Sequence, residues 1–223
     1  MKKQLLISVV SKYIAGLILV AVLLFVPAGS IAYLNGWLFI ALLFVPMFFL
    51  GLFLLLKAPD LLAKRLNTKE KESTQKKVVG LSALQFLLSF LLAALDFRFG
   101  WSHLPPMVVG TASVILLLSY ALYAEVMREN AYLSRTVEVQ EGQKLIDTGL
   151  YGIVRHPMYT STILLFLSIP LVLGSLPAFF VMLPYPLLLV QRINNEEALL
   201  EAGLAGYKEY KRKVKYRLLP LIW

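Results

Sequence analysis

Long apolar runs, separated by short polar segments, make up most of this chain. Four runs reach the length of about 20 residues that a helix needs to cross a bilayer. They cover residues 13–33, 36–56, 78–97 and 107–127. Two shorter runs follow at 159–175 and 177–190, separated by the turn-forming residues Gly174 to Pro177. The pattern predicts an all-α, polytopic membrane protein with about six spans, the last two forming a short hairpin.

Prolines in the two short runs predict irregular helices there. Pro170, Pro184 and Pro186 are expected to kink or break these arms. Irregular backbone at membrane depth is tolerated where it is buried in protein or lines a cavity. The hairpin is therefore expected either to cross the bilayer with little tilt or to lie partly inside the protein.

Bulk composition agrees with a membrane protein: 59% of the residues are hydrophobic, 16% are charged and the mean hydropathy is +0.74. Soluble domains average about 25% charged residues. In a soluble protein, the net charge of +9 would suggest a nucleic-acid partner. Here the accumulation of Lys and Arg in cytoplasmic loops explains the charge, so no nucleic-acid partner is expected. The absence of Cys excludes a thiol nucleophile, and two distant His residues indicate no metal site.

The positions of the basic residues predict the orientation of the chain. With six crossings, only Arg98 of the 22 Lys and Arg residues falls in a loop on one side of the membrane. Because Lys and Arg accumulate in cytoplasmic loops, the protein is expected to be a multi-pass membrane protein with both termini in the cytoplasm. The segment 57–77, with seven basic residues, is interpreted as a solvated linker without a function.

The chain is expected to have two parts. Residues 1–106 hold N-terminal membrane helices and the basic loop 57–77, and residues 107–223 form a C-terminal catalytic membrane subdomain. Two polar regions, 128–159 and 191–223, are not explained by membrane insertion and flank the predicted hairpin. Because the hairpin brings them together, we expect one cytosol-facing pocket built from both.

The polar cluster just before the hairpin is the first candidate site. Pro157 favours extended backbone at His156 and suits the first position of a helix, so Arg155 and His156 should precede a helix. The free N–H groups of such a helix start favour an anion, and Arg and His add to that preference. In the alternative reading, Arg155 only snorkels to the interface and His156 only caps the helix.

The second candidate site follows the last apolar run. On a helix, Arg192 and Glu196 share a face and pair, whereas Glu197 turns away and is free to meet a ligand ammonium. A surface salt bridge at a polar helix start is the alternative.

Weaker candidates lie on either side. Glu125 is deep enough in its span to be a substrate-site candidate, unless it pairs with Arg128, and Asn130 is a candidate for lining the substrate entrance. The stretch 206–214 predicts an amphipathic helix, lying either on the membrane surface or as a lid over the site.

Taken in order, these motifs resemble the isoprenylcysteine carboxyl methyltransferase family, which belongs with the phospholipid N-methyltransferases among integral-membrane methyltransferases. The resemblance covers about the last 100 residues. Its motifs are Gly149-Leu150-Tyr151, Arg155-His156-Pro157-Met158-Tyr159, Glu196-Glu197, and Gly206-Tyr207 with a late Leu219-Pro220.

The resemblance implies a C-terminal pocket for S-adenosylmethionine, entered from the bilayer by a lipophilic or prenylated substrate. The residues it assigns to the cofactor are Gly149, Leu150, Tyr151, Arg155, His156, Tyr159, Glu196 and Glu197. Arg192 would orient the substrate and, with Glu197, would serve catalysis. Gln143, Leu150, Ser161 and Ala205 depart from the family pattern, which leaves the acceptor open.

Several functions remain open at this point. The acceptor is a lipidic carboxylate or, alternatively, a phospholipid amine, for which Glu197 or Glu125 would act as a base. Membrane sterol reductases share a related Arg-His-Pro-x-Tyr segment and use a nicotinamide cofactor. A membrane carrier or assembly protein with a degenerate pocket is a non-enzymatic alternative. The sequence indicates no oligomeric state.

Overall fold

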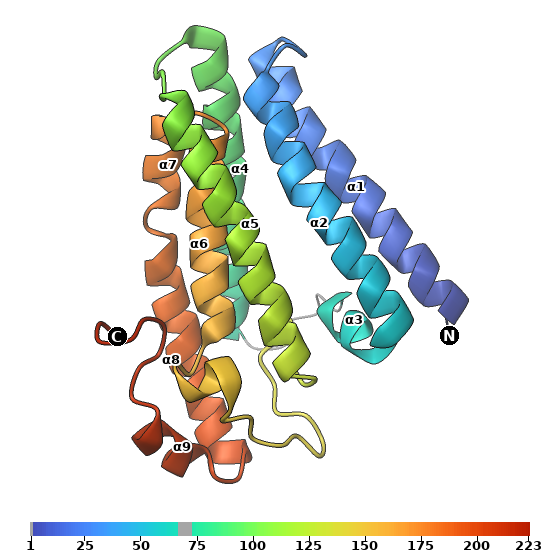
Figure 1. The fold of residues 1–223 in the computed structure, drawn as a ribbon, viewed down its shortest axis with the longest axis vertical. Coiled ribbons are helices and arrows are strands. Elements are labelled where there is room, and N and C mark those ends of the chain that lie inside the picture. The colour runs from blue at the N-terminus through green and yellow to red at the C-terminus, as the bar shows by residue number, and fades with distance from the viewer. Residues whose placement is uncertain (1, 67–72) are drawn as a thin grey trace.

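The computed structural model describes residues 2–66 and 73–223, and within them the regular structure is helical, without a strand (Figure 1). In this described part of the chain, five helical stretches are long and apolar enough to cross a bilayer, and a shorter apolar helix, α6, has 16 residues. The membrane helices are α1 (Lys2–Ala28), α2 (Leu34–Lys57), α4 (Ser73–Phe99), α5 (Pro106–Glu129), α6 (Pro157–Val172), and α7 (Leu176–Met182) with α8 (Tyr185–Gly203). The protein is therefore a polytopic helical membrane protein, as the sequence predicts.

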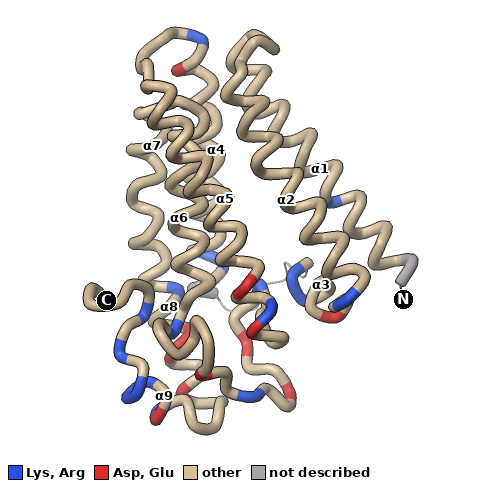
Figure 2. The backbone as a smooth tube through the Cα atoms, viewed as in Figure 1, with Lys and Arg blue, Asp and Glu red and all other residues tan. Residues whose placement is uncertain are grey.

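Short helices lie at one end of this bundle (Figure 1). They are α3 (Pro59–Leu66), the 3-10 helix η1 (Gly149–Gly152) and α9 (Tyr207–Lys213). Charged residues gather at the same end, and both chain termini lie toward it (Figure 2). Polar chemistry is thus concentrated at one end of an otherwise apolar bundle.

The hairpin forms where the turn residues predict it. Gly174 has a φ of +80°, a left-handed conformation that glycine adopts readily. The Ser175 hydroxyl then accepts a hydrogen bond from the Ala178 amide (3.2 Å) and caps α7. Pro170 lies near the end of α6 without breaking it, whereas Pro184 separates α7 from α8. The last pass is consequently a broken helix.

Two sequence expectations about the N-terminal half need correction. The sequence predicts the first span at 13–33, but α1 runs over Lys2–Ala28 because the apolar residues before Lys12 extend the helix, and Gly29 (φ +66°) ends it. The segment 57–77 was interpreted as a solvated linker. It contains α3, whose Leu61 is buried, and the start of α4; its residues 67–72 lie outside the described part of the chain.

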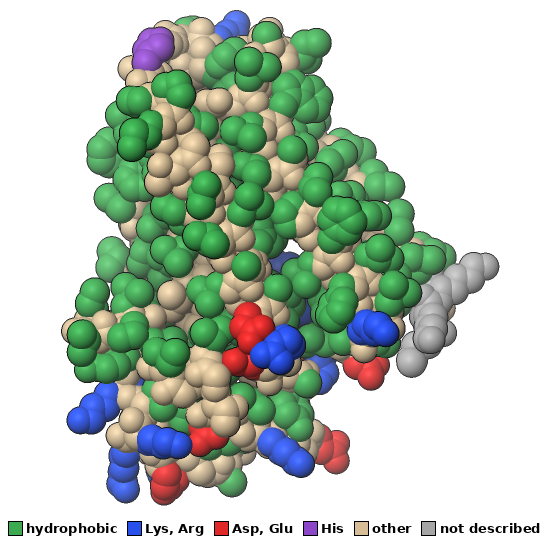
Figure 3. All heavy atoms as spheres, in the orientation of Figure 1, with side chains coloured by type: hydrophobic (Ala, Val, Ile, Leu, Met, Phe, Trp, Pro, Cys, Tyr) green, Lys and Arg blue, Asp and Glu red, His purple; other side chains and the backbone are tan. Residues whose placement is uncertain are grey.

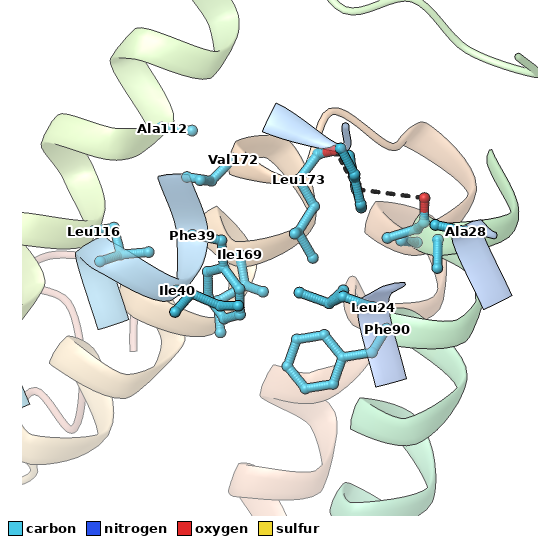
Figure 4. Close-up of a cluster of buried hydrophobic side chains, with 14 of the residues drawn as sticks. Leu24, Ala28, Phe39, Ile40, Phe90, Ala112, Leu116, Ile169, Val172 and Leu173 are labelled. Carbon is cyan, nitrogen blue, oxygen red and sulfur yellow. Dashed lines mark hydrogen bonds between the residues drawn. The ribbon is translucent and has the colours of Figure 1, made fainter. Parts of the chain in front are cut away.

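A cluster of buried apolar side chains joins the N-terminal helices to α4, α5 and α6 (Figure 4). Its members include Leu24, Phe39, Phe90, Leu116 and Ile169. Many other large apolar side chains remain exposed and cover the visible face of the bundle (Figure 3). An exposed apolar surface of this extent is expected where a protein faces lipid.

Candidate active site

A polar cavity of about 100 Å³ lies at the charged end of the bundle. The loop after α5, the residues that begin α6, the C-terminal half of α8 and helix α9 form its walls. Predicted site residues that line it are Asn130, Tyr151, Arg155, His156, Tyr159, Arg192 and Glu196. The two polar regions that flank the hairpin therefore meet, as the sequence predicts.

A buried ion-pair network ties the start of α6 to α8 and to the C-terminal tail. The Glu197 carboxylate accepts from Arg155 Nε (2.7 Å) and Arg217 Nη2 (3.0 Å), and lies 3.2 Å from His156 Nε2. Glu197 is only 2% exposed, and Arg155 and His156 are also buried. The backbone amides of Arg155 and His156 donate to the carbonyls of Tyr216 and Arg217, each at 2.9 Å. This network holds the segment that begins α6.

The two acidic residues of α8 face the opposite way from the prediction. Glu196 lines the cavity and accepts a hydrogen bond from the Tyr159 hydroxyl (2.5 Å), which in turn accepts from Arg192 Nε (2.9 Å). Tyr159 is thus inserted between Arg192 and Glu196, which were expected to pair directly. Glu197, expected to meet a ligand, is about 100° further around the helix and is held by Arg155.

Tyrosines form the part of the cavity nearest to α9. Tyr151 accepts from Asn130 Nδ2 (2.9 Å), and its carbonyl accepts from the Tyr210 hydroxyl (2.7 Å). Burial raises the pKa of Tyr151 well above its ordinary value, so its hydroxyl stays protonated at neutral pH. Tyr207 and Tyr210 pack with Val214 against the end of α8, so α9 forms one wall of the cavity.

The Tyr207 hydroxyl is buried and has no hydrogen-bond partner among the described residues. An unpartnered buried hydroxyl costs about 1–3 kcal/mol, which a bound ligand would recover by pairing with it. Tyr207 lines the polar cavity, so this hydroxyl is a further candidate contact for a ligand.

Gly149 and Leu150 do not line the cavity, although they were predicted to bind the cofactor. The Leu150 amide instead donates to the Glu129 carboxylate at 3.0 Å. Gly149 has a φ of +55°, and a Cβ there would overlap that carboxylate. In this structure both residues fix the end of α5 to η1.

Replacing Gly149 with alanine is therefore expected to destabilise the protein, by about 2 kcal/mol from backbone strain and further through displacement of Glu129. The matched control is Gly142→Ala, because Gly142 has a similar φ of +68° but open space around its Cβ position. Thermal unfolding of both variants in detergent measures the difference. Equal melting temperatures for the two variants would contradict the Glu129 contact.

Glu125 does not reach the site either. Its carboxylate pairs with Arg128 of the same helix, and both side chains are substantially exposed (40% and 71%). It lines neither the polar cavity nor the apolar cavity described next. The structure thus shows Glu125 in a local pair with Arg128, which was the alternative to a place in the substrate site.

A second, mostly apolar cavity of about 570 Å³ lies deeper in the bundle. Residues of α2, α4, α5, α6 and α8 line it, among them Leu50, Phe86, Tyr120, Leu165 and Leu189. The surface of the protein is hollowed where α2 meets α5 (Figure 3). Three arginines, Arg65, Arg135 and Arg192, are also part of the wall.

The polar and apolar cavities share Met158, Tyr159 and Arg192. Arg192 is 9% exposed, and it donates to Gln75 Oε1 (2.9 Å) and to the Arg135 carbonyl (2.7 Å) besides Tyr159. A polar ligand in one cavity and an apolar ligand in the other would therefore meet at these side chains.

Sequence reasoning missed Gln75 and Arg65, because both lie in the segment interpreted as a linker. A signal was present: Leu61 and Leu62 beside Lys64 and Arg65 form a short amphipathic pattern, which predicts a helix packed on the protein.

Comparison with known proteins identifies the part of the chain that carries this site. Residues 109–202 match the sequence model of the Isoprenylcysteine carboxyl methyltransferase (ICMT) family. They form a domain of that family. The ICMT domain runs from α5 almost to the end of α8 and thus holds Tyr159, Arg192 and Glu196. The family resemblance predicted from the motifs is confirmed over this segment.

The chain is also similar to Delta(14)-sterol reductases. It is 32% identical over 91 residues to the one from Mus musculus and 29% identical over 93 residues to the one from Methylotuvimicrobium alcaliphilum. Each match covers 40% of this chain but 22% of the relative, so the chain spans about a fifth of the length of these relatives.

Proposed function

We propose that this protein is an S-adenosylmethionine-dependent methyltransferase that methylates the carboxylate of a lipidic or prenylated substrate. The observation that carries the proposal is the junction of the polar and apolar cavities at Tyr159 and Arg192. Methyl transfer from a water-soluble donor to a lipid acceptor requires such a junction, because the two must be aligned while water is excluded. The ICMT domain agrees with this chemistry.

The polar side chains that line the polar cavity support binding of S-adenosylmethionine there. The Glu196 carboxylate suits its ammonium or ribose, and the Tyr207 hydroxyl needs a partner. Asn130, Tyr151 and His156 line the same cavity and would complete the site. When bound, S-adenosylmethionine supplies a methyl group activated by the positive sulfur.

The residues where the two cavities meet then need only to bind the donor and the acceptor and to orient them for methyl transfer. Arg192 orients the acceptor carboxylate, and its bond to Gln75 fixes the guanidinium in turn. Tyr159 holds Arg192 and Glu196 in register across the junction. A carboxylate is already ionised at neutral pH, so the reaction needs no side chain to remove a proton. We also infer from the basic residues at the charged end that this end, with both termini, faces the cytoplasm.

Membranes that contain the protein, incubated with methyl-labelled S-adenosylmethionine, are expected to yield a labelled lipid that loses its label as methanol in base. Such base lability identifies an ester. A base-stable label would instead indicate methyl transfer to an amine and would overturn the carboxylate assignment. Absence of labelled lipid across membranes from several sources would contradict methyl transfer itself.

A reductase is the second candidate, favoured by the similarity to Delta(14)-sterol reductases. A nicotinamide cofactor would then occupy the polar cavity. Isothermal titration calorimetry separates the two candidates. The methyltransferase is expected to bind S-adenosylhomocysteine and to show no heat with NADPH, whereas the reverse result supports the reductase.

A further inference from the structure

Arg65 lines the apolar cavity and gives its wall a positive charge. This residue lies outside the ICMT domain, which covers residues 109–202. It lies on α3, and its guanidinium donates to the Ser134 carbonyl (2.9 Å) and to the Tyr123 hydroxyl. Two further arginines, Arg135 and Arg192, line the same cavity. One region of an otherwise apolar cavity therefore carries three guanidinium groups.

The described part of the chain offers no carboxylate within ion-pair distance of Arg65 or Arg135. Burial, reinforced by the positive charge of Arg135, lowers the pKa of Arg65 to about 10. Arg65 is still protonated at neutral pH. Arg65 is partly buried, whereas Arg135 is exposed at the edge of the cavity. A charge that is shielded from water is costly unless a counter-charge accompanies it, so the position of Arg65 favours an anionic ligand.

The lining of the cavity indicates that the ligand also has an apolar part. Away from the arginines, its wall is apolar and comes from membrane helices on both sides, such as Leu50 of α2, Phe86 of α4 and Leu165 of α6. An occupant of this space therefore has an acyl- or prenyl-like chain, and its charge lies at one end.

We propose that Arg65 and Arg135 are specificity-determining residues that, together with Arg192, hold the anionic head of an amphiphile whose apolar chain fills the cavity. The inference rests on the proposed function only in taking this amphiphile as the methyl acceptor. Guanidinium groups bind carboxylates and phosphates through paired hydrogen bonds, and they repel an amine head. Acceptor choice is thus set partly by α3, outside the ICMT domain.

Binding of four lipids with one shared chain tests this inference without a methyl donor. The full-length protein in phosphatidylcholine nanodiscs is titrated with oleate, oleyl phosphate, oleylamine and oleyl alcohol, at mildly alkaline pH so that the carboxylic acid is ionised. Oleate or oleyl phosphate is expected to bind at least about tenfold more tightly than the amine and the alcohol. The first two lipids distinguish a carboxylate head from a phosphate head.

Arg65→Gln is expected to weaken binding of the preferred anionic lipid by about tenfold and to leave oleyl alcohol unchanged. Arg65→Lys retains the charge and should lose less. The matched control is Lys64→Gln, because Lys64 is the adjacent cation of α3 but lines neither cavity. Melting temperatures within a few degrees of wild type show that the variants are folded. If Arg65→Gln does not fold, the affinity of Arg65→Lys for the anionic lipid is compared with that of wild type instead.

Equal binding of the four lipids, or an unchanged affinity in folded Arg65→Gln, would overturn the inference. Because no methyl donor is present, either result is independent of methyl transfer. Conversely, selective binding of an anionic lipid by a protein that binds no S-adenosylhomocysteine would leave this inference standing and would reject the proposed function.

Discussion

Replacing Arg192 with leucine is expected to lower methyl transfer by about 100-fold or more. Arg192 is a charged side chain that reaches both cavities, and it is fixed by Tyr159, by Gln75 and by the carbonyl of Arg135. Leucine fills part of the same space but cannot orient an acceptor anion. Initial rates with labelled S-adenosylmethionine, measured on equal amounts of folded protein, give the effect.

The pattern of kinetic constants separates a role at the junction from a general loss of structure. Arg192→Leu should lower kcat and weaken acceptor binding, whereas S-adenosylhomocysteine affinity should change much less, because Glu196 and Tyr207 remain in the polar cavity. Arg212→Leu is the matched control: Arg212 is exposed on α9 and lines neither cavity. Wild-type rates in Arg192→Leu would reject the proposed meeting point of donor and acceptor.

Much of this fold follows from the spacing of apolar runs and turns. The runs predict the antiparallel membrane passes, and Gly174 with Ser175 predicts the hairpin that brings the two polar regions together. The bounds of α1 and the helix α3 were not predicted correctly. The apolar residues before Lys12 lengthen α1 at its start, and Gly29 ends it earlier than expected. In α3, Lys64 and Arg65 were taken as signs of solvent, whereas the neighbouring Leu61 and Leu62 are buried.

The composition of the site is predictable from its motifs, but its orientation is not. The sequence places Tyr159, Arg192 and the two glutamates in one region, and the structure brings them together. Which glutamate faces the cavity depends on partners that are distant in the sequence, since Tyr159 lies 37 residues from Glu196 and Arg217 lies 20 residues from Glu197. The contribution of Arg65 likewise depends on how α3 packs, which local spacing does not encode.

Replacing Glu197 with alanine is expected to destabilise the protein by about 3–5 kcal/mol. The carboxylate is almost fully buried and is shared by Arg155, His156 and Arg217, so its removal leaves positive charge buried without a counter-charge. Thermal unfolding of the purified protein in detergent measures the loss. Methyl transfer should fall as well, because Arg155 and His156 belong to the wall of the polar cavity.

Two further variants show whether the loss arises from the buried charge. Glu125→Ala removes an acidic residue whose pair with Arg128 is exposed, and such pairs contribute little to stability, so its melting temperature should stay close to wild type. The double variant Arg155→Met/Glu197→Leu removes both members of the shortest buried pair, and it should be more stable than Glu197→Ala because fewer uncompensated charges remain. If Glu197→Ala melts like Glu125→Ala, Glu197 is not the centre of a buried network, and its earlier predicted role as a ligand contact becomes the better interpretation.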